Sequence, residues 1–127
     1  DIKEAAVFNE TGIIGQVINN KSFYEVMLLT DTKSSIPLTN SKENFYCNAL
    51  GSGVSGYVTC SYNQLVWSDD HELGEKFFSS GLGGIYPKGI EIGNLESKKI
   101  INPSTTLLKI KLISNPLHSN LFGVIKL

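Results

Sequence analysis

Two histidines, His71 and His118, are the only side chains of this 127-residue chain whose ordinary pKa lies near neutral pH. Nucleophilic catalysis needs a serine or cysteine activated by such a base, and a third group that orients the base. His71 stands among acidic residues in what looks like an exposed turn, and His118 lies in the polar run SNPLHSN. The sequence therefore predicts no catalytic residue, and a β-barrel hydrolase with Ser/His chemistry is kept as the alternative.

Two glycine-rich stretches partly resemble functional motifs, one of a catalytic serine and one of a dinucleotide-binding site. GSGVSG (51–56) resembles a nucleophile elbow, but the last glycine of that motif would fall on Tyr57. In SSGLGGIYPKGIEIG (79–93), Gly81 and Gly83 fit a dinucleotide fingerprint, whereas Tyr86 occupies the third glycine position and no helix pattern follows. Both stretches are better explained as turns, and no cofactor is expected.

Metal and nucleic-acid binding are also disfavoured. The two cysteines are not arranged as a Cys-x-x-Cys pair, the histidines are scattered, and the acidic residues near position 70 lack the order of an EF-hand. All eleven basic residues are lysines, so the chain lacks the guanidinium fork that reads guanine and clamps phosphates. We expect neither a metal site nor a nucleic-acid partner.

The two cysteines flank GSGVSG symmetrically. If the segments 44–50 and 57–62 form a hairpin that turns between Gly53 and Val54, Cys47 faces Cys60 directly. At a non-hydrogen-bonded position their α-carbons would then be about 4.5 Å apart, close enough for a bridge. A disulfide and a pair of buried thiols both stay open.

The elements that must position these residues are short strands. In TLLKIKLI, Leu108 and Ile110 alternate with Lys109 and Lys111, as in a strand with one buried face. Only two places look helical: a single turn in SDDHELGEKF, and the start of the chain up to Val7. We predict an all-β fold, a small barrel or sandwich, with strands at 13–19, 23–30, 44–50, 56–62, 63–68, 75–80, 89–95, 105–114 and 121–127.

The glycine-rich run also resembles a family signature. SSGLGGIYPKGIEIG is similar to the TSG-L-GG-x-[FY]-P-x-G-x-x-x-G pattern of the bacterial rod shape-determining MreC family. TGIIGQV (11–17), VMLLTDTKSSIPL (26–38) and NPSTTL (102–107) resemble three further blocks of that family, in the family's order. The signature positions, which we expect to shape a turn, are Gly81, Leu82, Gly83, Gly84, Pro87, Gly89 and Gly93.

The resemblance implies an architecture and a location. It implies two small β-barrel-like domains, with residues 1–38 plus 105–127 forming the first and residues 39–104 inserted as the second. It also implies an extracytoplasmic domain at the cytoplasmic membrane, in the periplasm where an outer membrane exists. This fragment would be soluble, because the family's membrane anchor belongs to an N-terminal region that is missing here.

The resemblance further implies a non-enzymatic scaffold of the cell-wall elongation machinery. Its expected partners are the class B penicillin-binding transpeptidase of elongation, further copies of itself in an oligomer or filament, and other membrane proteins of the elongation complex. No catalytic activity is implied. The lack of a triad motif agrees with this, because fold and chemistry are separable.

Aromatic side chains are the candidates for partner binding, because they offer large, rigid contact area. Strand alternation must send about half of them inward, so each has core packing as its alternative. Exposed strand edges offer a second route, by addition of a strand from another copy or a partner. The candidates are Phe45, Tyr46, Tyr57, Tyr62, Trp67 and Tyr86.

Overall fold

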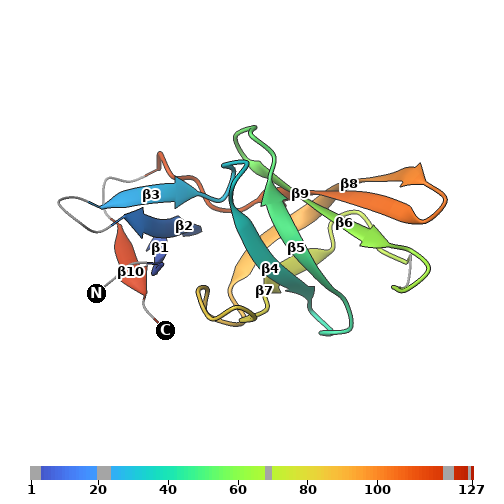
Figure 1. Cartoon of the computed structure of the whole chain (residues 1–127), viewed down its shortest axis with the longest axis horizontal. Helices are drawn as coiled ribbons and strands as arrows, with labels where there is room; N and C mark the ends of the chain where they lie inside the picture. The colour runs from blue at the N-terminus through green and yellow to red at the C-terminus, as the bar shows by residue number, and fades with distance from the viewer. Residues whose placement is uncertain (1–3, 20–23, 68–69, 119–121, 126) are drawn as a thin grey trace.

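The computed structural model describes residues 4–19, 24–67, 70–118, 122–125 and 127, and it is built of β-strands (Figure 1). No helix in this described part of the chain has the length and apolar character needed to cross a bilayer. The strands are β1 (Ala6–Asn9), β2 (Gly12–Asn19), β3 (Glu25–Leu28), β4 (Ser35–Asn40), β5 (Tyr46–Gly51), β6 (Tyr57–Asn63), β7 (Lys76–Ser79), β8 (Glu91–Asn102), β9 (Thr105–Leu112) and β10 (Gly123–Ile125).

Six strands close into an antiparallel barrel in the order β4-β5-β6-β9-β8-β7. The pairing of β4 with β7 closes it, through Leu38 opposite Ser79 and Asn40 opposite Phe77. The predicted alternation in β9 is confirmed, since Leu108 and Ile110 are fully buried while the lysines between and after them are exposed. Closure pairs strands all round the barrel, which hides their backbone edges from other chains except where a strand runs beyond its partner, as β8 does beyond β7.

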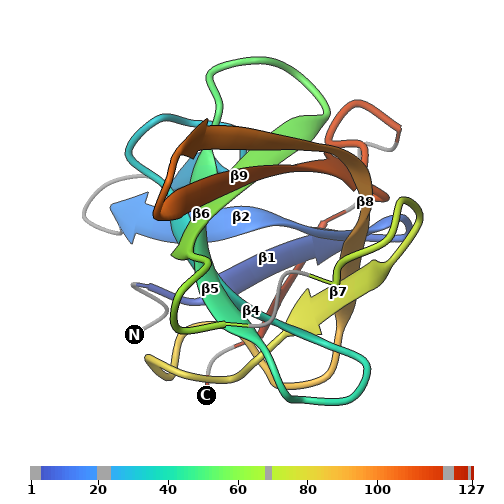
Figure 2. The same ribbon diagram turned by 90° about the vertical axis from the view of Figure 1, so that its right-hand side faces the viewer.

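The other four strands form an open sheet in the order β10-β1-β2-β3. It joins strands from both ends of the chain, since Ala6 of β1 pairs with Gln16 of β2 on one side and with Ile125 of β10 on the other. Figures 1 and 2 show this sheet at one end of the barrel, beside both termini. Its outer strands, β3 and β10, each have a partner on one side only.

The hydrophobic core is divided unequally between the two sheets. A large cluster fills the barrel and includes two residues of the open sheet, Ala6 and Ile13. A second cluster holds only Ala5, Val7, Ile14 and Val17. Most of the apolar burial that stabilises the chain is therefore in and against the barrel.

The all-β prediction is confirmed, with differences at particular segments. No strand forms at 64–67, because the chain turns after β6 ends at Asn63: the backbone N–H groups of Val66 and Trp67 donate to the carbonyl of Asn63. β1 occupies part of the stretch considered for a helix end, and β4 was expected only through the family resemblance. β8 runs seven residues beyond the predicted end at 95, to Asn102.

Two other expectations stay open or lie outside the description. The predicted capping residue of the helical turn, Ser68, lies outside the described residues, and residues 70–75 contain a turn at 73–74 and no helix. The predicted domain boundaries stay a prediction. The strand pairing shows that both β4 and β9 are bonded into the closed barrel.

Candidate functional site

The signature loop at 79–93 is a shaped connection between β7 and β8. Gly81 has a φ of 81°, and a Cβ there would lie 2.8 Å from Cβ of Lys88, so both the backbone and the space require glycine. The hydroxyl of Ser79 donates to the carbonyl of Pro87 and accepts from the N–H of Ile90 at 3.0 Å. These bonds fix the return of the chain into β8.

Tyr86 of this loop connects the barrel to the open sheet. Its ring is 2% exposed, and its hydroxyl donates to Oε1 of Gln16 on β2 at 3.2 Å. Burial raises the pKa of Tyr86 to about 12, so the phenol stays neutral as a donor. Gln16 was missed at the sequence level, although a lone glutamine inside the apolar strand GIIGQVIN is a usable signal for a buried polar contact.

Three of the six aromatic candidates are corrected by their burial. Phe45, Tyr62 and Tyr86 are 2%, 6% and 2% exposed, so core packing, the alternative for each, is what the structure shows. Phe45 packs edge-on against Tyr62 and Trp67, with ring centroids 5.1 and 5.5 Å apart. Side chains buried in this way have no area left for a partner.

The other three aromatic candidates reach the surface at two places. Tyr46 is 36% exposed and Trp67 is half-buried beside it, with ring centroids 6.3 Å apart at the end of the barrel near the β4–β5 turn. Tyr57 is half-buried on the outer face of β6, where its hydroxyl donates to Glu96 at 3.2 Å. Whether these three contact a partner stays a prediction.

His71 is a core residue of the barrel end. Its ring lies 4.4 Å from Phe45, centroid to centroid, and its Nδ1 is 2.8 Å from Oε1 of Glu75. Its buried Nε2 has no hydrogen-bond partner within the part of the chain that the structure describes. The expected exposed turn is therefore partly wrong, since the neighbours Asp70 and Glu72 are exposed while His71 itself is buried. Among the described residues, no hydroxyl or thiol is hydrogen-bonded to either ring nitrogen, which is the contact that would activate a nucleophile.

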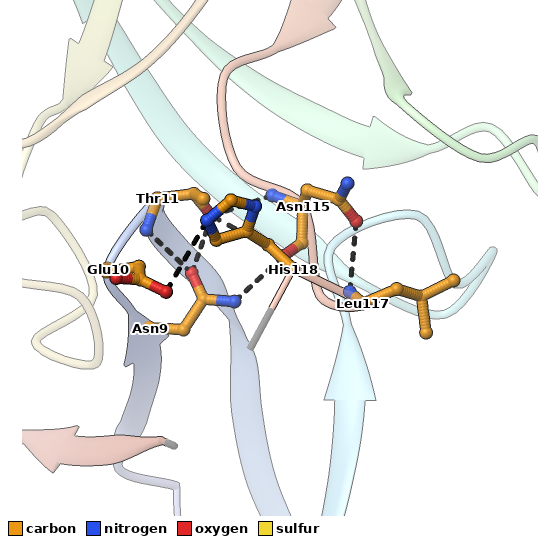
Figure 3. A network of polar contacts seen from close by, with 6 residues as sticks. All are labelled: Asn9, Glu10, Thr11, Asn115, Leu117 and His118. Carbon is orange, nitrogen blue, oxygen red and sulfur yellow. Dashed lines mark hydrogen bonds and ion pairs between the residues drawn. The ribbon is translucent and has the colours of Figure 1, made fainter. Parts of the chain in front are cut away.

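His118 lies in a polar network that ties the segment after β9 to the β1–β2 turn (Figure 3). Its Nε2 is 3.4 Å from Oε1 of Glu10. The side-chain amide of Asn9 donates to the carbonyl of Asn115 at 2.8 Å, and the N–H of Asn115 donates to the Thr11 hydroxyl at 2.8 Å. These contacts are structural, and within the described residues no group of three or more His, Cys, Asp or Glu side chains is placed to hold a metal ion.

Cys47 and Cys60 are joined by a disulfide, with α-carbons 6.0 Å apart. The predicted register was wrong, because Leu50 pairs with Thr59 and Gly51 with Val58, which does not bring the two cysteines directly opposite each other. Only those two residue pairs join β5 to β6. The disulfide therefore joins the two strands beyond the end of their backbone pairing.

Comparison with known families identifies the chain. The family model described as rod shape-determining protein MreC, barrel core, matches residues 2–125. The cell shape-determining protein MreC of Haemophilus influenzae is 33% identical over 92 residues, which are 72% of this chain and 26% of that relative. The chain thus spans only a minor part of the curated relatives it matches.

Solved structures share the fold. One described as MreC covers 97% of this chain and 70% of its own, with a TM-score of 0.85 and 22% identity. The major periplasmic domain of the cell shape-determining filament MreC has a TM-score of 0.66 at 19% identity, covering 88% of this chain and 70% of its own. A complex between PBP2 and MreC from Helicobacter pylori matches with a TM-score of 0.62 at 12% identity, covering 87% of this chain and 78% of its own.

Proposed function

This chain belongs to the MreC family of rod shape-determining proteins, and we propose that it is the periplasmic barrel core of a non-enzymatic scaffold for cell-wall elongation. The match of the family model over residues 2–125 carries the proposal. A solved MreC is described as a periplasmic domain, and another is described in complex with PBP2. By analogy, this chain acts on the outer side of the cytoplasmic membrane and binds the class B transpeptidase of elongation.

The candidate contact surface is the exposed aromatic pair Tyr46 and Trp67, with Tyr57 as a separate candidate. The pair is supported by its partial exposure and by the rigid aromatic cluster of Phe45 beneath it. A rigid aromatic anchor loses little conformational entropy when a partner covers it. Binding through this pair buries the two rings against the transpeptidase.

Self-association is proposed through the open sheet. β3 and β10 each have one unpaired edge, and Val26 and Val124 on them are 40% and 43% exposed. Such edges can accept a strand from a second copy.

We also propose contacts to other membrane proteins of the elongation complex. The same proposal includes the division into two barrel-like domains with one inserted in the other. The division is supported by the open sheet, which takes its strands from both ends of the chain.

The test is a binding measurement between this fragment and the elongation transpeptidase of the same bacterium, followed by cross-link mapping. We expect saturable binding that Tyr46→Ala weakens about tenfold, as for an aromatic anchor. Tyr24→Ala, an exposed tyrosine before the edge strand β3, is the matched control and should leave the affinity unchanged. Absence of saturable binding to the transpeptidase would overturn the proposed partner. Equal losses in the two variants would overturn the proposed surface.

A further inference from the structure

The outer face of β6, β9 and β8 carries a local surplus of positive charge. The chain as a whole has a formal net charge of −1. Around Glu96 on this face, however, the exposed side chains of Lys99, Lys109 and Lys111 stand against one carboxylate, and β6 has no charged residue. Glu91, the other carboxylate of β8, lies 4.0 Å from the ammonium of Lys76 on β7. Three positive charges and one negative charge leave a surplus of two. Such a face attracts an acidic partner, and salt screens the attraction.

A hollow opens in the same face. It has a volume of about 250 Å³ and is lined by residues of β6, β8, β9 and the β5–β6 turn. This volume is below the roughly 300 to 1,000 Å³ of sites that enclose a whole small molecule. It suits one inserted side chain. The exposed surface inside the hollow is mostly apolar, so two ammonium groups and four hydroxyl groups of the lining residues belong to its rim more than to its floor. The lining residues are Ser52, Val54, Tyr57, Thr59, Ser97, Lys99, Leu107 and Lys109.

One carboxylate of the chain itself, that of Glu96, is already bound by two of the lining residues, Tyr57 and Lys109. Oε1 of Glu96 accepts from the Tyr57 hydroxyl at 3.2 Å, and its Oε2 lies 3.7 Å from Nζ of Lys109. The same ammonium lies 4.2 Å from the centroid of the Tyr57 ring. Lys99, on the other side of the hollow's lining, forms no ion pair with the residues that the structure describes. A second carboxylate can therefore be received there.

The backbone beside the hollow is also open. β7 pairs with β8 only as far as Asn94, so from Glu96 to Asn102 the edge of β8 that faces away from β9 has no strand partner in the described chain. All seven of these residues are exposed, on both faces of the ribbon. Figure 1 shows the β8–β9 hairpin projecting from the barrel at the end opposite the termini. An edge of this kind pairs with an extended peptide.

We propose that this face binds an extended acidic segment of a partner protein, which lies along the free edge of β8 and inserts the methylene groups of a glutamate into the hollow, with the carboxylate at the rim between Lys99 and Lys109. The free edge and the side-chain-sized hollow favour a peptide over an anionic membrane, which would meet a flat surface. The surface is distinct from the aromatic pair of Tyr46 and Trp67 and from the edges of the open sheet. The proposal holds whether or not the transpeptidase is the partner.

The test is amide chemical-shift mapping of the ¹⁵N-labelled chain with a synthetic decapeptide of alternating threonine and glutamate. We expect saturable shifts at Tyr57, Thr59, Lys99 and Lys109, and a weaker affinity as salt is raised. The same peptide with glutamine in place of glutamate should give no shifts at this face. Shifts that do not distinguish the two peptides, or shifts elsewhere in the chain, would overturn the proposal.

Two double variants test whether the effect of charge on peptide binding comes from the lysines at the hollow. Lys99→Gln with Lys109→Gln should raise Kd about five- to tenfold, since exposed charge pairs contribute about 0.2 to 1 kcal/mol each. Lys42→Gln with Lys76→Gln removes the same charge from the lining of a different hollow and should leave Kd unchanged. An equal rise in Kd in both double variants would show that binding depends only on the net charge of the chain, and would overturn the proposed site. Binding to phosphatidylglycerol vesicles without binding to the glutamate peptide would show that the face binds an anionic membrane and would overturn the peptide proposal.

Discussion

The closed barrel and the open sheet differ in how they treat the unpaired backbone edges of their strands. The barrel pairs its six strands in a ring around a large apolar cluster. The open sheet has four strands, two free edges and a second cluster of four residues. Two more of its residues, Ala6 and Ile13, are buried in the large cluster of the barrel. The barrel therefore supplies most of the stability, while the sheet keeps edges available for association.

The two regions also differ in what fixes them. The backbone pairing of the barrel wall is shortest between β5 and β6, and beyond its end the disulfide joins the two strands. The open sheet is fixed to the barrel by a few specific polar contacts, among them Tyr86 to Gln16. This difference predicts that the same substitution lowers stability more in the barrel than in the sheet, and that single polar contacts matter most at the junction.

A cavity in the barrel core is the largest expected effect. Phe77 is 0% exposed and lies in the aromatic cluster with Phe45 and His71, so Phe77→Ala should lower the free energy of unfolding by about 3–5 kcal/mol. Val17→Ala in the sheet's own cluster should cost about 1.5 kcal/mol, the value for two buried methyl groups. Urea unfolding measures both. Val58→Ala, the same change at a fully buried barrel position, should cost more than Val17→Ala, and equal costs for these two would remove the distinction between the two cores.

Reduction of the disulfide tests the weak part of the barrel wall. Cys47 and Cys60 are separated by 13 positions, and a loop of that size is stabilised by about 3 kcal/mol when it is cross-linked. We expect the reduced protein to lose about this much stability, with hydrogen exchange increasing first in β5 and β6. Mass spectrometry under non-reducing conditions checks the premise. Two alkylatable thiols before reduction would show that the bridge is absent and that the wall holds without it.

The sequence predicted the all-β class well because the signals are local. Period-two alternation in β9 and glycines at tight turns depend on neighbouring residues only, and most strands were placed from them. The family resemblance supplied β4 and the role of the signature loop. The partition into a ring and an open sheet is a property of non-local pairing, such as β4 with β7, which no local pattern encodes.

The candidate site was harder to predict for the same reason. Whether an aromatic residue points inward depends on register, and a change of one residue moves every side chain to the other face. Phe45 and Tyr62 therefore could not be separated from Tyr46 and Tyr57 by composition. The cysteine pair was found by its spacing, although the assumed register was wrong. The Tyr57, Glu96 and Lys109 contact joins β6, β8 and β9 and is visible only after folding.

Two matched glycine substitutions compare the rigidity of the regions directly. A Cβ at Gly93 would lie 2.3 Å from the carbonyl oxygen of Lys111, and one at Gly15 would lie 2.1 Å from that of Met27. β8 lies between β7 and β9 and cannot move aside, so Gly93→Ala should cost about 3 kcal/mol, at the upper end for overpacking. Gly15→Ala meets the edge strand β3, which can shift outward, so about 1 kcal/mol is expected.

Hydrogen exchange should separate the two glycine variants as well. Gly15→Ala should increase exchange in β3 alone, while Gly93→Ala should increase it around the barrel. A global loss of protection in Gly15→Ala would mean that the open sheet is as constrained as the barrel. The contrast between the two regions would then lie in strand pairing only, with no difference in rigidity.

The contact between Tyr86 and Gln16 is the smallest effect and tests the junction itself. Tyr86→Phe removes the donor and leaves the buried amide of Gln16 without it, which should cost about 1 kcal/mol at neutral pH. Because burial raises the pKa of Tyr86 from 10.0 to about 12, the wild-type contact is complete below pH 10. It is lost as the pH rises towards 12, since the unfolded chain ionises first. The wild type should therefore lose stability over this range more steeply than Tyr86→Phe. Parallel slopes for the two proteins would show that this phenol does not hold the open sheet against the barrel.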